Sequence, residues 1–262
     1  MALEWDIWIL LLLLLGLPYV GGPILVRFTQ RVAAHPELEP LDPEEEDDIP
    51  RAALRYFDEI EDDLAPDGFE LKGYFLLQDY VPSVQSILAY FEIKKTGATA
   101  LAAAVYLERQ GVPTALKVTY LDFGTTFQDG VNVTTNNSPH SGVFAKTPGK
   151  TVLAFSPDVH PSELFQIHQA MVIQFGSHAP RKTRGKQRIE EFLAEGLIRE
   201  IERQVAVGYY YPDESADVYR PTWKGAILMT WKSLWPIKQL RGGLARRRAE
   251  RFRREVMQDA VS

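Results

Sequence analysis

Histidines and carboxylates are the side chains of this chain that could transfer protons or bind a metal. His160 and His168 lie eight positions apart at the expected start of a helix, with Glu163 between them. Two imidazoles and a carboxylate brought together could serve a hydrolase. The spacing does not match the H-E-x-x-H pattern, and a catalytic zinc site needs three protein ligands in fixed geometry. We therefore expect no metal site and interpret His168, on the apolar side of its helix, as a hydrogen-bonded core residue.

Few other residues suggest catalysis. The chain has no cysteine, which excludes disulfides, thiolate metal sites and thiol catalysis. The glycine motifs of phosphate-binding loops, dinucleotide-binding folds and nucleophile elbows do not occur in the sequence. Asp122, Asp129 and Asp158 are candidate acids, although turn and helix-cap roles explain Asp129 and Asp158. The sequence predicts no cofactor, leaves the catalytic residues unknown and leaves open whether the chain is an enzyme.

The N-terminal segment has the composition of a membrane span. Residues Ile7–Val26 contain no charged side chain, and Ile9–Leu15 is a continuous run of leucine and isoleucine. A helix needs about 20 apolar residues to cross a hydrocarbon core about 30 Å thick. Trp5, Trp8 and Tyr19 carry amphipathic rings of the kind that settle near lipid headgroups. The sequence therefore predicts a transmembrane anchor over residues 1–28.

A cleaved signal peptide is the alternative interpretation of this segment. Such a peptide begins with basic residues, whereas Glu4 and Asp6 precede the apolar run and no Lys or Arg does. The flank therefore favours an uncleaved anchor. Arg27 and Arg31 follow the run directly. By the positive-inside rule, the N-terminus is expected outside and the remainder of the chain in the cytoplasm.

The region after the anchor predicts an acidic linker over residues 29–50. Between Pro36 and Glu70 there are 15 acidic residues against Arg51 and Arg55, a balance of −13. Prolines stiffen such a segment and like charges extend it. Because anionic lipid repels acidic residues, we expect this linker to act as a spacer that holds the domain away from the membrane.

Residues 51–215 are expected to form an α+β domain. A helix should follow Pro50, because four apolar residues recur on one face; these are Leu54, Phe57, Ile60 and Leu64. Strands are expected at 69–77, 87–93, 99–108, 117–136 (with a turn) and 151–155, and helices at 161–175 and 187–206. The alanines of 99–108 also suit a helix, so that the pattern favours a strand only slightly. The prediction is an antiparallel β-meander of five to seven strands with flanking helices.

The pair Asp129-Gly130 gives the strongest local turn signal. It separates two runs of alternating apolar residues. An Asp-Gly pair favours a tight hairpin, because both residues can adopt positive φ. We therefore expect an antiparallel hairpin centred on these two residues.

Residues 216–262 predict a basic amphipathic tail close to the membrane. Between Arg220 and Glu255 there are 11 basic residues against Glu250 and Glu255, a balance of +9. Indole rings enter the headgroup layer, and each basic residue near anionic lipid contributes about 1 kcal/mol. The predicted lipid-binding residues are Trp223, Trp231, Trp235, Arg246, Arg247, Arg248, Arg251, Arg253 and Arg254. The alternative, in which this helix packs on the domain, agrees with the pattern equally well.

Two other partners could bind the basic tail. Nucleic acid would also attract arginines, but the net charge of −6 and the nearby membrane make it the weaker hypothesis. The acidic linker could pair with the tail and mask it from lipid, and salt would weaken that pairing.

These features together predict a single-pass membrane protein with a non-enzymatic binding or scaffold domain at the cytoplasmic face. One alternative is a membrane-tethered hydrolase that uses His160 and His168. The other is an accessory subunit of a membrane complex, in which the anchor packs on another helix. The expected partners are the membrane, anionic lipids and other membrane-protein subunits.

Overall fold

The computed structural model describes residues 2–42, 50–109, 112–138 and 142–259, and within these ranges it describes the side chains of all but residues 2–15, 108–109, 112–115 and 259. Its helices are α1 (Ala2–Thr29), α2 (Arg51–Leu64), the 3-10 turn η1 (Ala65–Asp67), α3 (Pro161–Phe175), α4 (Ile189–Ala206), α5 (Trp223–Ser233) and α6 (Ile237–Asp259). Its strands are β1 (Val32–Ala33), β2 (Leu38–Leu41), β3 (Glu70–Val81), β4 (Val84–Ile93), β5 (Ala98–Arg109), β6 (Val112–Thr126), β7 (Asn132–Asn136), β8 (Lys150–Ala154), β9 (Tyr210–Asp213) and β10 (Val218–Pro221).

Seven strands form the main sheet, in the order β2-β3-β4-β5-β6-β7-β8. Neighbouring strands run antiparallel from β2 to β7, which confirms a mostly antiparallel sheet within an α+β fold. The last pair differs from the predicted meander, because β8 runs parallel to β7. A parallel neighbour needs a long return connection, and residues 137–149 make it.

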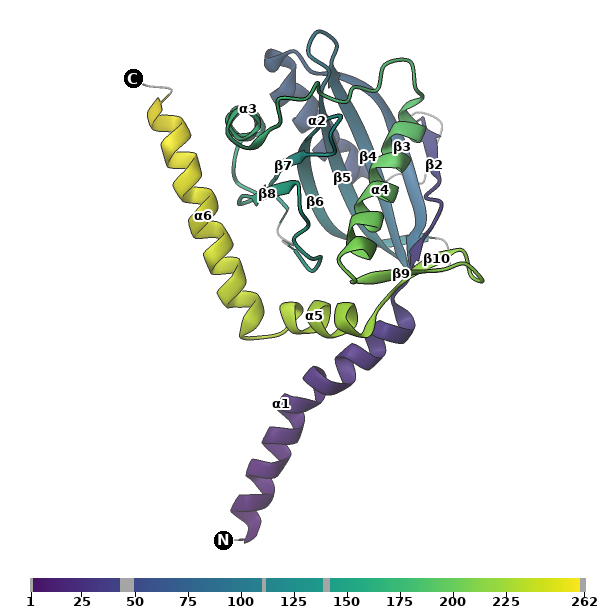
Figure 1. Cartoon of the computed structure of the whole chain (residues 1–262), viewed down its shortest axis with the longest axis vertical. Helices are drawn as coiled ribbons and strands as arrows, with labels where there is room; N and C mark the ends of the chain where they lie inside the picture. The colour runs from purple at the N-terminus through teal and green to yellow at the C-terminus, as the bar shows by residue number, and fades with distance from the viewer. Residues whose placement is uncertain (1, 43–49, 110–111, 139–141, 260–262) are drawn as a thin grey trace.

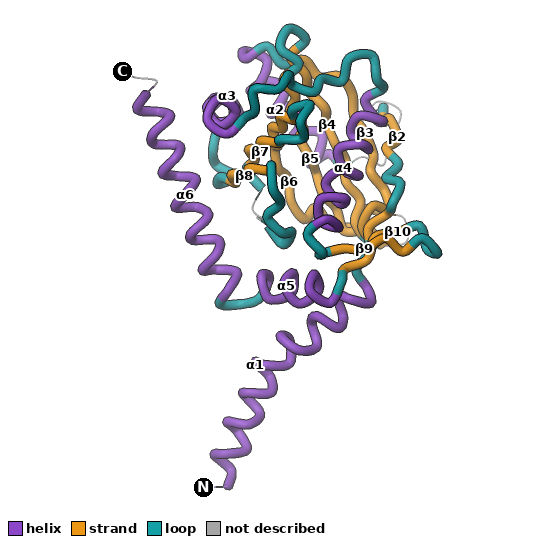
Figure 2. Tube along the Cα trace, in the orientation of Figure 1, coloured by secondary structure: helices purple, strands orange, loops and turns teal. Residues whose placement is uncertain are grey.

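The central strands are buried on both faces, and this decides where the helices lie. On β4, Ile87, Ala89 and Phe91 belong to one core, while Leu88 and Tyr90 between them belong to another. Successive side chains of a strand point to opposite faces, so each face needs its own cover. Helices α2, α3 and α6 contribute residues to the first core, and α4 contributes them to the second. Figures 1 and 2 show α4 lying across one face of the sheet, with α2 behind it.

The alanine-rich stretch is strand β5, as the sequence slightly favoured. It pairs along its whole length with β4 and β6. Ala100, Ala102 and Ala104 face one core and Ala103 faces the other. Small side chains at the middle of the sheet leave room for the larger aromatic residues of β4 and β6, which explains why alanine, a good helix former, lies in a strand here.

The predicted hairpin joins β6 to β7, but its turn differs from the expected one. Only Gly130 has positive φ, at 88°. The turn runs from Phe127, whose N–H donates to the carbonyl of Val131 over 2.8 Å, and the Asp129 carboxylate accepts the N–H of Val131 over 3.1 Å. The aspartate therefore caps the turn through its side chain instead of adopting positive φ itself.

The structure corrects the predicted linker over residues 29–50. β1 pairs with β10 in a three-stranded sheet with β9, and β2 forms an edge of the main sheet. Leu38 and Leu41 of β2 are buried, and they anchor a segment that composition alone describes as a solvated spacer. The run of five acidic residues from Glu44 to Asp48 lies outside the described residues.

The helices predicted within residues 51–215 are confirmed. α2 buries Phe57, Ile60 and Leu64 on one face, as expected. α3 and α4 begin and end within two residues of the expected positions. α5 begins after Thr222, whose hydroxyl accepts the N–H of Gly225 over 3.0 Å. The short β9–β10 hairpin was not predicted, because its strands contain only four residues each.

Helix α1 extends away from the domain, with the N-terminus at its far end (Figure 1). Among the residues whose side chains the structure describes, which begin at Gly16 in this helix, no helix is long and apolar enough to cross a membrane. The anchor predicted over residues 1–28 lies partly outside those residues, so that the structure does not show it.

Gly225 permits the closest contact between α5 and the domain, and this contact can be tested. A Cβ atom at Gly225 would lie 2.1 Å from the carbonyl oxygen of Tyr209, which is backbone and cannot rotate away. We expect Gly225→Ala to lower the free energy of unfolding by about 1–3 kcal/mol.

The matched control is Gly196→Ala in α4, where a Cβ meets no atom within 4 Å. That variant should gain up to about 1 kcal/mol through helix propensity. Urea unfolding followed by far-UV circular dichroism measures both, and equal effects would contradict the prediction.

Candidate functional site

The contact between α1 and α5 brings the predicted aromatic residues together. We name it the α1–α5 corner and define it by Tyr19, Gly22, Pro23, Arg27 and Phe28 of α1 with Trp223, Thr230, Trp231 and Trp235 in or just after α5. Tyr19 donates its hydroxyl hydrogen to the carbonyl of Trp235. Phe28 meets Trp223 edge to face, with 6.2 Å between ring centroids. Tyr19, the earlier residue of α1, contacts Trp235 after the end of α5, and Phe28, the later one, contacts Trp223 at its start. The two helices therefore pack antiparallel.

Arg27 holds the upper end of the corner. Its guanidinium lies over the rings of Tyr211 and Trp223, 5.0 and 5.9 Å from their centroids, and donates to the Tyr211 hydroxyl over 2.9 Å. Cation–π contacts of this kind fix an arginine that would otherwise move freely. The sequence suggested only that Arg27 marks the membrane side, and its structural role depends on β9, which was not predicted.

Large apolar side chains are exposed around the corner. On α1 these are Leu17, Val20, Ile24, Leu25 and Phe28, and beyond them come Trp223, Trp231 and Trp235. Phe28 is 67% exposed and Trp235 is 68% exposed, although aromatic rings of this size usually bury most of their surface. Contiguous exposed apolar patches on a protein mark contact with another protein or with a membrane. Leu240 and Leu244 continue the patch into the first turns of α6.

The predicted arginines lie elsewhere. Helix α6 starts near the corner and runs along the side of the domain, away from the free end of α1 (Figure 1). Its buried residues Ala249 and Phe252 pack into the core that faces α3. Arg253 forms a two-pronged ion pair with Glu163 of α3, at 2.5 and 2.8 Å. The other five arginines of the predicted set are exposed on this helix: Arg246, Arg247, Arg248, Arg251 and Arg254. The structure thus groups the three tryptophans and separates them from the arginines.

The histidines proposed for a hydrolase do not share a site. His168 is buried, and its two ring nitrogens bond the hydroxyls of Thr125 and Thr135 over 2.9 and 3.0 Å. Burial lowers the pKa of His168 to about 4, and the charge of Arg181 adds to this effect, so the ring is neutral at pH 7. His168 is therefore the core residue that the sequence indicated.

His160 and Glu163 serve the surface instead. His160 caps α3 by accepting the N–H of Ser162 over 3.3 Å, and it lies 3.2 Å from Asp63. Glu163 is occupied by Arg253. Within the described part of the chain, no group of three or more histidines and carboxylates could hold a metal.

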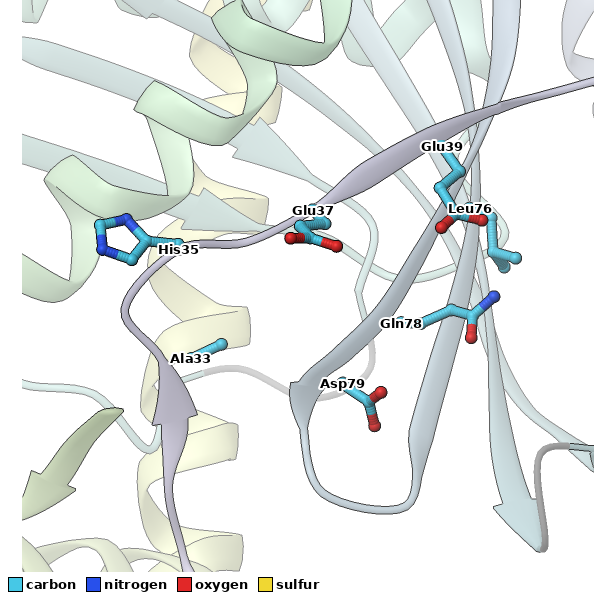
Figure 3. A pocket seen from close by; sticks show the side chains of 7 residues that line it. All are labelled: Ala33, His35, Glu37, Glu39, Leu76, Gln78 and Asp79. Atoms are coloured by element: carbon cyan, nitrogen blue, oxygen red, sulfur yellow. The ribbon is translucent and has the colours of Figure 1, made fainter. Parts of the chain in front are cut away.

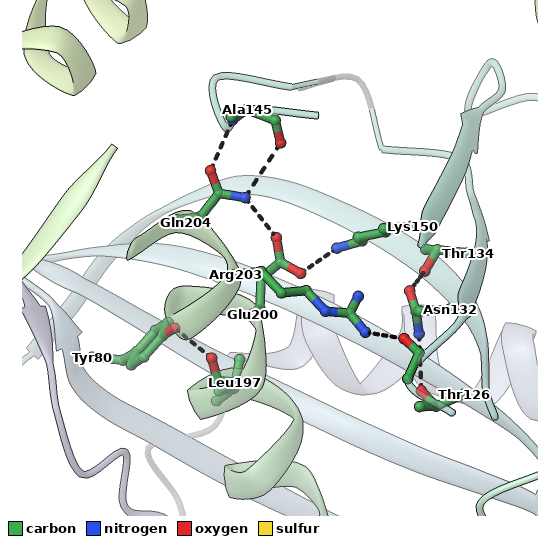
Figure 4. Close-up of polar contacts among 11 residues, drawn as sticks. Tyr80, Thr126, Asn132, Thr134, Ala145, Lys150, Leu197, Glu200, Arg203 and Gln204 are labelled. Carbon is green, nitrogen blue, oxygen red and sulfur yellow. Dashed lines mark hydrogen bonds and ion pairs between the residues drawn. The ribbon is translucent and has the colours of Figure 1, made fainter. Parts of the chain in front are cut away.

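A polar seam between α4 and the sheet was not found from the sequence. Lys150 of β8 donates to Glu200 of α4 over 2.5 Å, and Gln204 bonds Glu200 over 3.2 Å. Gln204 also accepts the N–H of Ala145 over 2.9 Å and donates to its carbonyl over 3.3 Å, as Figure 4 shows. The residues of the seam come from β8, α4 and a loop. No spacing within one segment of the sequence could therefore reveal them.

Asp122 lies beside this seam and carries a buried carboxylate oxygen without a hydrogen-bond partner among the described residues. Burial raises the pKa of Asp122 to about 7; Lys150 opposes the rise and Glu200 adds to it. A carboxyl group with a pKa near neutrality can act as a general acid or base.

A small cavity of about 160 Å³ lies where the chain passes from β1 to β2 (Figure 3). Its lining includes His35 and three carboxylates, Glu37, Glu39 and Asp79. The side chain of His35 lies 3.5 Å from Asp217 at the surface. Acidic groups around an open hollow can attract cations, but they do not select one ligand here.

Lys232 fixes α5 to the domain. Its ammonium group donates to the carbonyls of Val143 and Phe144 over 3.3 and 2.9 Å and to the Tyr209 hydroxyl over 2.7 Å. Burial lowers the pKa of Lys232 to about 8, and Arg241 lowers it further. The arrangement can hold a helix and a loop in place, which is a structural role.

Comparison with protein families, with curated proteins and with solved structures finds no match for this chain. The geometry above is therefore the basis for any functional assignment, and the α1–α5 corner with its exposed aromatic residues is the candidate site.

The buried carboxyl group of Asp122 predicts a measurable pH dependence. A raised pKa means that the folded protein holds this proton more tightly than the unfolded chain does, so this contribution to stability is present below pH 4 and is lost as the pH rises through about 7. Asn mimics the neutral acid, and Asp122→Asn should therefore raise the free energy of unfolding at pH 8 by on the order of 2 kcal/mol and leave it nearly unchanged at pH 4. Urea midpoints across this range test the difference.

Glu59→Gln is the matched control, because Glu59 is exposed on α2. It should keep the wild-type pH profile. An Asp122→Asn profile parallel to that of the wild type would show that this carboxyl group does not titrate near neutrality.

Proposed function

We propose that this chain is a single-pass membrane protein that presents a non-enzymatic binding or scaffold domain at the cytoplasmic face. The observation that carries the proposal is the exposed apolar surface of the α1–α5 corner. Phe28 and Trp235 gain little from water contact, whereas amphipathic rings are stabilised at the boundary between lipid headgroups and hydrocarbon. Contact with a lipid surface therefore explains the exposed aromatic rings better than contact with water alone.

The composition of α1 supports the anchor in this proposal. The helix includes the uncharged run Ile7–Val26. Its backbone hydrogen bonds are satisfied within the helix except near Pro18 and Pro23, as a span in hydrocarbon requires. Arg27 and Arg31 follow the run, and their charges favour the cytoplasmic side for the domain.

Three of the polar groups named above have structural tasks, which supports a binding or scaffold role. His168 joins two strands to α3, Glu163 joins α3 to α6, and Lys150 joins the sheet to α4. Because α6 runs away from the corner (Figure 1), the proposal rests on the α1–α5 corner and not on the arginines of α6.

The proposed topology predicts where the C-terminus lies. A reporter enzyme that is active only in the cytoplasm, fused after Ser262, should be active in cells. The protein should also remain in the membrane fraction after alkaline carbonate extraction, because an uncharged helix of about 20 residues does not leave the bilayer. Activity from a reporter that works only outside, or release by carbonate, would contradict the proposed topology or the anchor, respectively.

The proposed lipid contact predicts the surroundings of Trp235. Since the chain has no native cysteine, Trp235→Cys can be labelled selectively with an environment-sensitive fluorophore. In nanodiscs the label should emit at shorter wavelength than in water and should be quenched by brominated lipid. The control is Ile173→Cys on α3, which is 86% exposed on a helix remote from α1 (Figure 1). Its label should remain in water.

An unquenched label at Trp235 in a carbonate-resistant protein would contradict the lipid contact. If that label nevertheless emits at short wavelength in native membranes, another protein covers the patch, and the accessory-subunit alternative gains support.

A further inference from the structure

We infer that α1 and α5 form one rigid unit that fixes the tilt of the domain over the bilayer, with Trp231 as the positioning residue that holds the two helices together. This inference rests on the proposed function, because a fixed tilt matters only if α1 is anchored. It differs from the sequence prediction, in which a proline-stiffened acidic linker alone holds the domain away from the membrane.

A side chain of α5 supplies a hydrogen bond that a proline removes from α1. Pro23 has no N–H, so the carbonyl four residues earlier, that of Tyr19, lacks its donor within the helix. The indole N–H of Trp231 donates to this carbonyl over 3.1 Å. A side chain from α5 thus supplies the hydrogen bond that the proline removes. Near a membrane this bond matters more, because an unpaired carbonyl has little water to bond.

Close packing beside this bond depends on Gly22. A Cβ atom at Gly22 would lie 2.6 Å from Cγ2 of Thr230. The absence of a side chain therefore lets α5 approach α1 closely, at the residue next to Trp231. The Thr230 hydroxyl has no hydrogen-bond partner among the described residues, so packing rather than polarity holds this contact.

The contacts between the two helices are spread along α1, and this opposes rotation of α1 relative to α5. Tyr19 meets Trp231 and Trp235, Gly22 meets Thr230, and Arg27 meets Trp223. From Tyr19 to Arg27 the helix rises about 12 Å. Two helices joined at points this far apart cannot pivot about a single contact.

The other side of α5 is attached to the domain with similar closeness. Gly225 packs against the Tyr209 carbonyl, and Lys232 bonds two carbonyls of the loop before β8. The Thr222 hydroxyl donates to the carbonyl of Gly208 over 2.7 Å. A continuous set of contacts therefore runs from α1 through α5 to the loops of the domain.

Distance measurements between spin labels test the rigid unit in the full chain. Gly16 of α1 and Gly196 of α4 both have open space where a Cβ would lie, and the chain contains no other cysteine, so Gly16→Cys/Gly196→Cys gives two defined labels. Pulsed electron paramagnetic resonance in nanodiscs should give one narrow distance distribution. Adding Trp231→Phe keeps a ring but removes the donor, and it should broaden the distribution to on the order of twice its width, because the carbonyl freed by Pro23 then leaves the helix able to bend.

The matched control is Trp235→Phe, because Trp235 takes part in the corner through its backbone carbonyl, which the substitution keeps. It should leave the distribution narrow. A narrow distribution in the Trp231→Phe variant would overturn the inference, as would equal broadening in both tryptophan variants.

A second pair of variants tests the close approach without touching the hydrogen bond. Gly22→Ala should shift or broaden the distribution through the contact with Thr230, and Thr230→Ala added to it should restore the wild-type distribution. General damage to the fold would not be restored in this way. Failure of the second substitution to restore the distance would contradict the assigned contact.

Carbonate extraction of the same labelled proteins distinguishes failure of the proposed anchor from failure of the rigid unit. A narrow distribution in a protein that carbonate releases would refute the proposed anchor and keep the rigid unit. A broad wild-type distribution in a protein that resists extraction would refute the rigid unit and keep the anchor.

Discussion

The central strands of the main sheet are apolar on both faces, and the rest of the structure depends on this constraint. β4 alternates residues of two cores, and β5 places alanines against both. A sheet of this kind is stable only when each face is covered. Helices α2, α3 and α6 cover one side and α4 covers the other, which fixes the order of layers seen in Figure 2.

The helices on each face of the sheet also bury polar groups, and these groups differ in their hydrogen bonding. His168 lies where α3 meets the sheet, and two threonine hydroxyls satisfy both of its ring nitrogens. Asp122 lies beside the seam under α4, where one carboxylate oxygen has no partner in the described part of the chain. A satisfied polar group stabilises the fold, whereas an unsatisfied one costs desolvation energy. The two faces of one sheet therefore differ in how fully their buried polar groups are satisfied.

Helix α5 links this domain to α1. Its small residues Gly225 and Ala226 are buried toward the fold, while its tryptophans remain at the surface. One helix therefore contacts the sheet through close backbone packing and α1 through aromatic and hydrogen-bonding contacts. Helix α5 has no single apolar face, because one side of it contacts the domain and another contacts α1.

The sequence by itself determined the helices of the domain and the strands from β3 to β8, because these depend on local periodicity. The apolar face of α2, these strands and the hairpin at Gly130 all follow from spacing within one segment. The same holds for the apolar composition of residues 7–26 and for His168 as a core residue, which can be read from its place on an apolar helix face.

Only the tertiary structure decided which distant segments meet. β2 pairs with β3, and Trp231 reaches Tyr19 across 212 positions of the chain. The seam of Lys150 and Glu200 likewise joins a strand to a helix that follows it by 50 residues. Pairings of this kind arise from the packing of whole layers, and no local pattern encodes them. The same physical reason separates the tryptophans from the arginines of one predicted tail, because burial of Ala249 and Phe252 turns α6 along the domain.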